Sequence, residues 1–163
     1  MKKILAALLF VSIAFSSNIK DDTYFLGFGG GKIKILSTES TASVNFGYYF
    51  YDPNIYKITN RIYLNFNYID SDADFYITNL KLDWIKSGDI FSPFLGVSVG
   101  YLYFDQNNND YSTNIWGFQG GLMLSLGSVI DIELSASWQK AFEKKNIWNN
   151  NIKNVSAGIN INF

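Results

Sequence analysis

Residues 42–50 read Ala-Ser-Val-Asn-Phe-Gly-Tyr-Tyr-Phe, and this stretch decides the fold. Its even-numbered positions are all apolar or aromatic, whereas its odd-numbered positions carry serine, asparagine, glycine and tyrosine. Strict alternation with a period of two is typical of a β-strand that has one apolar face and one polar face. The stretch therefore predicts a strand, not a helix.

The same alternation recurs from Asp21 to the end of the sequence. It predicts eight strands, near residues 24–34, 41–51, 56–68, 75–85, 91–104, 114–126, 129–139 and 152–163. These segments are longer than the roughly 5–6 residues usual in soluble sheets, and they approach the roughly 9–11 residues that a strand needs to cross a bilayer. We therefore expect an all-β domain over residues 21–163, an eight-stranded antiparallel up-and-down transmembrane β-barrel.

The connections between the expected strands alternate in character. Tight turns are expected at residues 52–54, 86–89 and 127–128, where turn-forming residues gather. Longer polar loops are expected at residues 36–40, 69–74, 105–113 and 140–151. Short turns at one end and longer loops at the other are typical of barrels of the bacterial outer membrane, with the short turns and both termini on the periplasmic side.

The composition excludes several classes of function. The 163 residues include no cysteine and no histidine, and the net charge is −1. Without cysteine there is no disulfide and no thiolate metal site, and without histidine the commonest general base and metal ligand is missing. A chain without a basic excess is also unsuited to bind nucleic acid. We therefore expect no cofactor, no metal ion and no enzymatic activity.

The N-terminus has the features of a secretory signal peptide. Lys2 and Lys3 precede the apolar run 4–15, and small residues follow it. The run is too short for a spanning helix, which needs about 20 apolar residues. We expect residues 1–16 to be the signal peptide, with cleavage near Ser16, and the protein to be exported.

The two faces of the strands distinguish a membrane barrel from a soluble one, whose apolar face would point inward. Along the apolar face, aliphatic residues occupy the middle of the strands and aromatic residues gather at both ends. The aromatic residues expected near the loops are Tyr68, Tyr76, Tyr103, Trp116 and Trp138; those expected near the turns are Tyr24, Phe50, Trp84 and Phe163. Tyrosine and tryptophan rings are favoured at the two interfaces of a bilayer, so this sorting predicts an apolar face turned toward lipid.

The opposite face is rich in glycine, serine and asparagine and should line a narrow lumen. Five charged residues are expected there, at neighbouring depths: Arg61, Lys81, Asp83, Asp131 and Glu133. Because unpaired buried charge is costly, we expect an ion-pair network in which Glu133 faces Arg61 or Lys81. In a barrel this narrow, side chains fill the interior. A path for ions along the same charges is the alternative.

Three stretches together resemble the small eight-stranded outer-membrane β-barrels, such as the transmembrane domain of outer-membrane protein A. They are the glycine-rich residues 24–31, the Pro-aromatic-x-Gly-x-x-x-Gly-Tyr pattern within residues 92–101, and the alternating apolar residues before Phe163. The resemblance implies a multi-pass protein of the outer membrane of a Gram-negative cell. It also implies that Phe163 is the signal read by the barrel-assembly machinery. The enzymes of this group rely on histidine, which this chain lacks.

The remaining polar segments are expected to be exposed loops. Residues 70–74 place three aspartates at alternate positions but lack the rest of a calcium-loop pattern. The asparagine-rich segments 106–110 and 146–151, which include Trp148, would carry any surface recognition. We expect a structural or surface-interaction protein, with outer-membrane lipid and lipopolysaccharide as neighbours and an unidentified surface ligand. A narrow porin-like channel and a loop-mediated adhesin are the alternatives.

Overall fold

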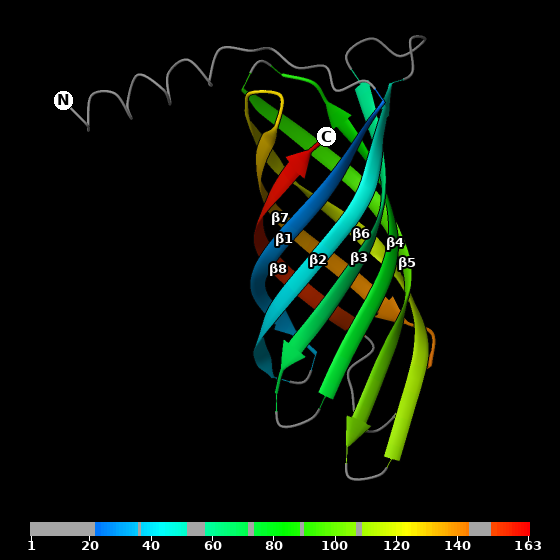
Figure 1. Cartoon of the computed structure of the whole chain (residues 1–163). Coiled ribbons are helices and arrows are strands. Elements are labelled where there is room, and N and C mark those ends of the chain that lie inside the picture. Colours follow the sequence, from blue (N-terminus) through cyan, green and yellow to red (C-terminus); the bar gives the residue numbers. More distant parts are fainter. Residues whose placement is uncertain are drawn as a thin grey trace, which may run out of the picture.

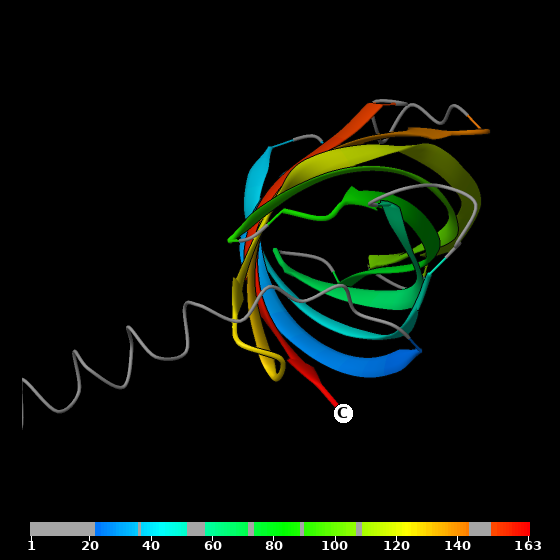
Figure 2. The same cartoon turned by 90° about the horizontal axis from the view of Figure 1, so that it is seen from above.

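In the computed structural model eight antiparallel strands follow one another in chain order and close into a barrel (Figures 1 and 2). The structure describes residues 22–35, 37–51, 58–71, 74–88, 90–106, 109–143 and 151–163. The strands are β1 (Thr23–Lys34), β2 (Thr38–Tyr51), β3 (Ile58–Asp70), β4 (Asp74–Lys86), β5 (Phe91–Gln106), β6 (Asn109–Leu126), β7 (Ile130–Ala141) and β8 (Asn151–Asn162). The predicted fold class is confirmed. The predicted signal peptide, residues 1–16, lies outside the described residues.

The barrel has two distinct ends. The loop end carries the connections that follow β1, β3, β5 and β7, and it lies at the bottom of Figure 1. The terminal end carries Thr23, Phe163 and the other three connections. One of these is the tight turn after β6, where Gly127 adopts a φ of 80° that favours glycine. Among the described residues, no helix is long and apolar enough to cross a membrane.

Two of the loops at the loop end are shorter in the structure than the sequence predicted. β2 already begins at Thr38, inside the expected loop 36–40, and β5 and β6 remain paired as far as Gln106 and Asn109, inside the expected loop 105–113. The reason is that backbone hydrogen bonds continue the ladder into segments that have no regular apolar alternation, so this alternation marks only part of each strand. The β5–β6 hairpin consequently projects furthest from the barrel (Figure 1).

The strands are strongly staggered around the barrel. Following register partners once around from Tyr49 leads back to β2 at Glu39, ten residues nearer the loop end. Such a stagger requires the strands to tilt by about 40° from the barrel axis. Because of this tilt, residues far apart in sequence lie at one depth in the lumen.

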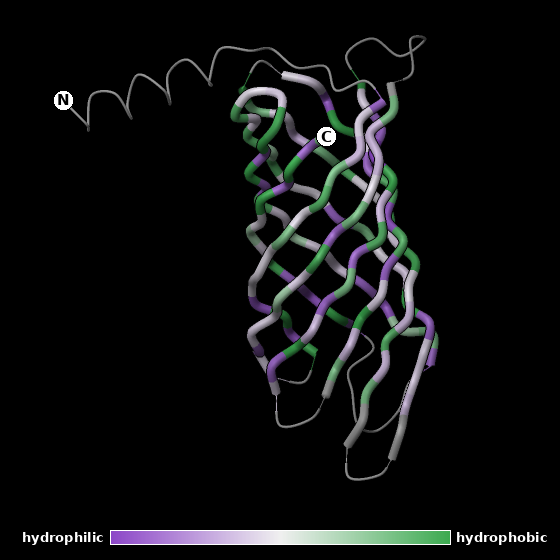
Figure 3. The backbone as a smooth tube through the Cα atoms, viewed as in Figure 1, coloured by the Kyte–Doolittle hydropathy of each residue, from purple (hydrophilic) through white to green (hydrophobic). Residues whose placement is uncertain are grey.

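The outer face is apolar and the middle of the lumen is polar, the inverse of a soluble barrel. Large apolar side chains such as Phe28, Leu95 and Val99 are half or more exposed on the outside, whereas Arg61 and Asp83 are fully buried. Hydrophobic and hydrophilic residues alternate along the strands in Figure 3. Apolar side chains turned outward need an apolar medium around them.

The lumen also contains two apolar clusters, which were not predicted from the glycine, serine and asparagine residues of the inward face. The loop-end cluster consists of Ile33, Ile35, Ile69, Phe75, Ile77, Leu102, Phe104, Ile115, Ala141 and Ile152. The terminal-end cluster consists of Phe25, Tyr49, Tyr63, Ile85, Phe94 and Met123. The lumen is therefore polar in its middle, as expected, and apolar toward both ends of the barrel.

Candidate functional site

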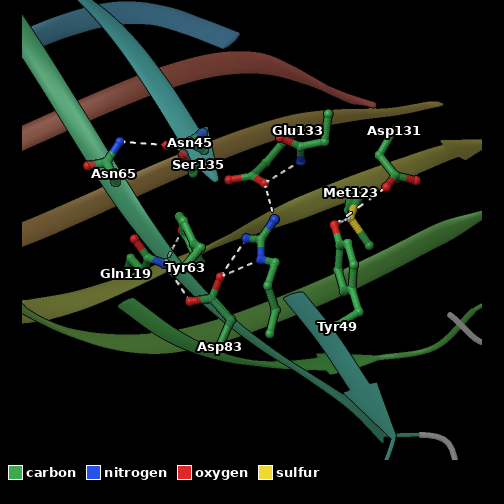
Figure 4. A network of polar contacts seen from close by, with 12 residues as sticks. Asn45, Tyr49, Tyr63, Asn65, Asp83, Gln119, Met123, Asp131, Glu133 and Ser135 are labelled. Carbon is green, nitrogen blue, oxygen red and sulfur yellow. Dashed lines mark hydrogen bonds and ion pairs between the residues drawn. The ribbon is translucent and has the colours of Figure 1, made fainter. Parts of the chain in front are cut away.

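Arg61 lies at the centre of the polar part of the lumen. This residue of β3 is 0% exposed. Its Nε and Nη2 donate to Oδ2 of Asp83 at 3.0 and 2.5 Å, and its Nη1 donates to Oε2 of Glu133 at 2.6 Å. Figure 4 shows Asp83 and Glu133 at the two ends of these contacts. One guanidinium thus neutralises two buried carboxylates through charge-assisted hydrogen bonds.

The pair Arg61–Glu133 crosses the lumen. In the closed ring, β3 and β7 are four strands apart in either direction, so they lie on opposite walls. Asp83, by contrast, is the register partner of Arg61 on the neighbouring strand β4. The ion pairs therefore tie one wall of the barrel to the other and occupy the space between them.

Four aromatic rings surround the Arg61 guanidinium. Its Cζ lies 4.6 Å from the ring centroid of Tyr63, 5.1 Å from that of Phe94, 5.5 Å from that of Phe25 and 5.9 Å from that of Tyr49. These distances are within the range of cation–π attraction. All four rings belong to the terminal-end cluster. This cluster therefore packs directly against the Arg61 guanidinium and shields it from water.

Asp83 has a second set of partners, and a glycine makes room for them. The amide nitrogen of Gln119 donates to Oδ1 of Asp83 and to the hydroxyl oxygen of Tyr63, the latter at 2.6 Å. Gly96 lies between Asp83 and Gln119 in the register. A Cβ atom at Gly96 would clash with the Asp83 carboxylate. This glycine is therefore required by the network.

The two other charged residues expected in the network lie beside it. Asp131 Oδ2 accepts hydrogen bonds from the Tyr49 hydroxyl at 3.5 Å and from Nδ2 of Asn162 at 3.0 Å. Lys81 points its Nζ toward the Tyr63 ring, 5.5 Å from the centroid, and forms no ion pair with another described residue. Of the five expected residues, the structure joins Arg61, Asp83 and Glu133 directly.

An asparagine-rich layer lies between the charged network and the loop-end cluster. Nδ2 of Asn65 donates to Oδ1 of Asn45 at 2.7 Å, while Oδ1 of Asn65 accepts from Asn67 and Asn79 at 2.6 and 3.2 Å. Gln139 then donates across the lumen to Asn79 at 2.8 Å. Asn79 and Gln139 were not predicted from the sequence. Both have odd residue numbers, as do the expected lumen residues of the same strands, so the alternation of each strand could have placed them in the lumen.

The cavity left among these side chains is small. It has a volume of about 20 Å³ and is lined in part by Lys81, Glu133 and Asn160. A space of this size is close to the minimum that holds one water molecule. The loop-end cluster then closes the lumen with ten apolar or small side chains. In the described part of the chain, the geometry favours a filled interior over an ion path.

The nine aromatic residues expected at the interfaces all face outward. Near the loop end, Tyr68 and Tyr76 are in ring contact at 5.6 Å, and Trp116 and Trp138 at 5.8 Å. At the terminal end, Phe163 is 68% exposed, while its backbone nitrogen donates to the carbonyl of Tyr24 at 2.9 Å. The remaining members, Phe50, Trp84 and Tyr103, lie on the same face.

Comparison with known proteins identifies the fold. No protein-family profile and no curated protein matches the sequence. Solved structures do match: Neisserial surface protein A is 15% identical over 86% of this chain and 97% of its own, with a TM-score of 0.61. The N-terminal β-barrel domain of Pseudomonas aeruginosa OprF is 12% identical over 88% and 98%, with a TM-score of 0.69. This chain has the fold of the small eight-stranded outer-membrane β-barrels.

Eight-stranded outer-membrane barrels differ in activity, so the fold leaves function open. The outer-membrane enzyme PagL also matches, at 15% identity over 84% of this chain and 98% of its own, with a TM-score of 0.57. The function must therefore be argued from the residues of this barrel.

The loops expected to carry recognition are described only in part. Of the segment 106–110, the backbone at Gln106, Asn109 and Asp110 continues the strands. Trp148 and the segment 146–150 lie outside the described residues, as does the centre of the aspartate segment 70–74. Within the described residues, no cluster of acidic side chains is arranged to hold a metal ion.

Proposed function

We propose that the protein is a non-conducting outer-membrane barrel with a structural or surface-interaction role. The observation that carries this proposal is the pair Arg61–Glu133, which joins opposite walls of the lumen at 2.6 Å. The layers on either side add to it: the terminal-end cluster encloses the guanidinium, and the loop-end cluster closes the other half. A solute would have to break these contacts to pass.

Several features support a location in the outer membrane of a Gram-negative cell, with the loop end facing outward. Apolar side chains cover the outside, and aromatic side chains gather toward both ends of that face. In this proposal residues 1–16 direct export, Phe163 is read by the barrel-assembly machinery, and the outer face contacts membrane lipid and lipopolysaccharide. No nucleic acid and no cofactor is assigned as a partner.

We assign no enzymatic activity. The chain has no histidine. Its two ion-paired carboxylates, Asp83 and Glu133, are buried and already neutralised by Arg61. A catalytic carboxylate must reach its substrate, and these two are sealed between apolar layers.

Conductance in planar bilayers tests the proposal. Purified protein that shows heat-modifiable migration on a denaturing gel should give no single-channel steps at any applied voltage, while a porin in the same bilayer gives them. Reproducible steps from the folded protein would replace the structural role with the narrow porin-like channel.

One observation favours a second function, a loop-mediated adhesin. The β5–β6 ladder extends from Phe91 to Gln106, longer than any other pair, and carries its hairpin beyond the rest of the loop end (Figure 1). A variant in which residues 106–109 are replaced by a two-residue Asn-Gly turn keeps Phe104, Tyr111 and the barrel-forming part of both strands. If the hairpin is an adhesive element, this variant should lose binding to host cells or matrix that the full chain shows; equal binding by both would exclude the hairpin.

A further inference from the structure

Four lysines form a compact patch on the outer face near the loop end. Lys34 of β1 and Lys153 of β8 are register partners. Lys32 is two residues from Lys34 on the same face of β1. Lys140 of β7 is two residues from Trp138, the register partner of Lys153. From a rise of about 3.3 Å per residue and a tilt of about 40°, the four lie within about 5 Å of one another in height. We call these residues the lysine patch.

None of the four lysines forms an ion pair with another described residue. All four side chains are exposed. Lys32 donates to the Ser40 hydroxyl at 2.8 Å, and the described ion pairs are both made by Arg61. Like charges directly opposite on one face of a sheet repel each other, as Lys34 and Lys153 must. An anion from outside the barrel would relieve this repulsion.

An apolar groove begins directly beside the patch. Trp138 is the register partner of Lys153, and Trp116 is that of Lys140. The groove has a volume of about 460 Å³. It runs over the partners Gly120 and Ala136, whose small side chains leave a depression. Leu95, Val155, Phe118, Trp138 and Lys153 are among the residues that border it, with Gln119, Ser137 and Asn154 also in its lining. The groove therefore has an apolar body and a cationic end.

We propose that the lysine patch and this groove bind one lipopolysaccharide molecule through its bisphosphorylated lipid A portion. The phosphates would contact the lysines, and an acyl chain would lie over Gly120 and Ala136 between the aromatic side chains. The inference rests on the proposed function, because it requires the loop end to meet the outer leaflet. It adds to that function a specific lipid and a specific side of the barrel.

The arrangement selects this occupant over other lipids in two ways. Four amines spread over three strands exceed what a single phosphate can contact, so two phosphates match the charge better. Another apolar groove, which shares Leu95 and Gly120 with the first and extends past Trp84 toward the terminal end, has Lys86 as the lone cation among its lining residues. A comparable apolar surface without a lysine patch thus serves as an internal control.

Binding of lipid A by the refolded barrel tests the proposal. The full chain is refolded in neutral detergent and titrated with bisphosphorylated lipid A, and intrinsic tryptophan fluorescence together with native mass spectrometry reports binding. The variants are Lys34→Gln with Lys153→Gln, which removes the opposed charges, and Ala136→Leu, which fills the groove. Lys86→Gln is the matched control, an exposed outward lysine at the other end of the barrel.

We expect one lipid A per barrel. Binding should be at least about tenfold weaker in the double lysine variant, because lysines at a membrane surface attract anionic lipid. It should also be weaker in Ala136→Leu and unchanged in Lys86→Gln. Equal affinity for dephosphorylated lipid A, equal affinity in all variants, or displacement by phosphatidylglycerol at equal concentration would overturn the assignment. Heat-modifiable migration and silent bilayers, measured on the same samples, show separately whether the proposed function holds.

Discussion

Arg61 of β3 and Glu133 of β7 meet at 2.6 Å although their strands lie on opposite walls of the barrel. Both side chains are buried, so neither charge can be solvated if the other is lost. Breaking such a pair by removing one partner costs far more than the pair contributes in net stability. The ion pair therefore opposes any change in the distance between the two walls at this depth of the barrel.

Replacing Arg61 by Met should destabilise the folded barrel strongly. Two carboxylates, Asp83 and Glu133, would remain buried without a cation. An uncompensated buried charge of this kind costs about 3–5 kcal/mol. The free energy of unfolding in urea, measured in vesicles or detergent, should fall by this amount.

Two further variants show whether charge is the cause. Lys81→Met removes a lumen cation that has no ion pair in the described structure, so it should cost clearly less. Arg61→Met combined with Asp83→Asn and Glu133→Gln removes both orphaned charges and should recover much of the lost stability. Equal losses in Arg61→Met and Lys81→Met would contradict the network described here.

Replacing Gly96 by Ala should disturb the same network through size alone. The new Cβ would strike Oδ1 and Cγ of Asp83 and the carbonyl of Leu82. Overpacking of this kind costs about 1–3 kcal/mol. Gly30→Ala is the control, because its Cβ would point outward and meet only the Thr41 carbonyl, at 3.2 Å. If the unfolding midpoint falls equally in the two variants, the clash with Asp83 is not the cause of the destabilisation.

The alternation of apolar and polar residues was enough to predict the fold. It located all eight strands because the outer face must be apolar along nearly its whole length, so every second residue carries the signal. The same rule failed for Thr38 and Asn109, which pair outside the apolar zone. Nothing in local composition separates a polar strand end from a polar loop.

The interior was predictable only in part. Parity placed Arg61, Asp83 and Glu133 in the lumen, but which cation meets which carboxylate depends on the stagger of ten residues and on side chains that cross the bore. The loop-end cluster was missed because Ile77 and Leu102 were assigned to neither face of their strands. A strict parity count from Lys81 and Gly100 would have placed both residues inside.

Replacing Leu102 by Ala should destabilise the barrel without opening it. Leu102 is 1% exposed in the loop-end cluster, and truncation of a buried leucine costs about 2–5 kcal/mol through lost contacts and the cavity that remains. The charged layer around Arg61 still closes the lumen in this variant. Planar bilayers should therefore stay silent while the urea midpoint falls; conductance from Leu102→Ala alone would mean that the charged layer does not seal the bore.

Fluorescence quenching should place the aromatic residues relative to the membrane. Variants that retain a single tryptophan, either Trp84 or Trp138, are refolded into vesicles whose lipids carry bromine at different depths. Both residues lie toward the ends of the outer face, so we expect stronger quenching by bromine near the headgroups than near the chain ends. Val97→Trp in a background free of other tryptophans is the control, because this outward residue lies about midway in height between Trp84 and Trp138 by the strand register and should show the opposite order. The same depth for all three tryptophans would contradict the two girdles.

Replacing Phe163 by Ser should separate assembly from stability. The Phe163 side chain is 68% exposed, and what ties this residue to the barrel is a pair of backbone hydrogen bonds with Tyr24, at 2.9 and 3.1 Å, which serine retains. Because this face of the barrel meets lipid, replacement of an outward apolar side chain by serine lowers stability in vesicles at either Phe163 or Val155. Unfolding of refolded Phe163→Ser should thus resemble that of Val155→Ser, whereas the amount of folded barrel in the membranes of expressing cells should fall severalfold for Phe163→Ser alone. Val155→Ser, at an equally exposed outward position of the same strand, should leave that amount unchanged. Normal accumulation of both variants in cells would show that the aromatic ring is not an assembly signal. A much larger loss of stability in vesicles for Phe163→Ser than for Val155→Ser would show the same, because instability alone would then explain its loss from cells.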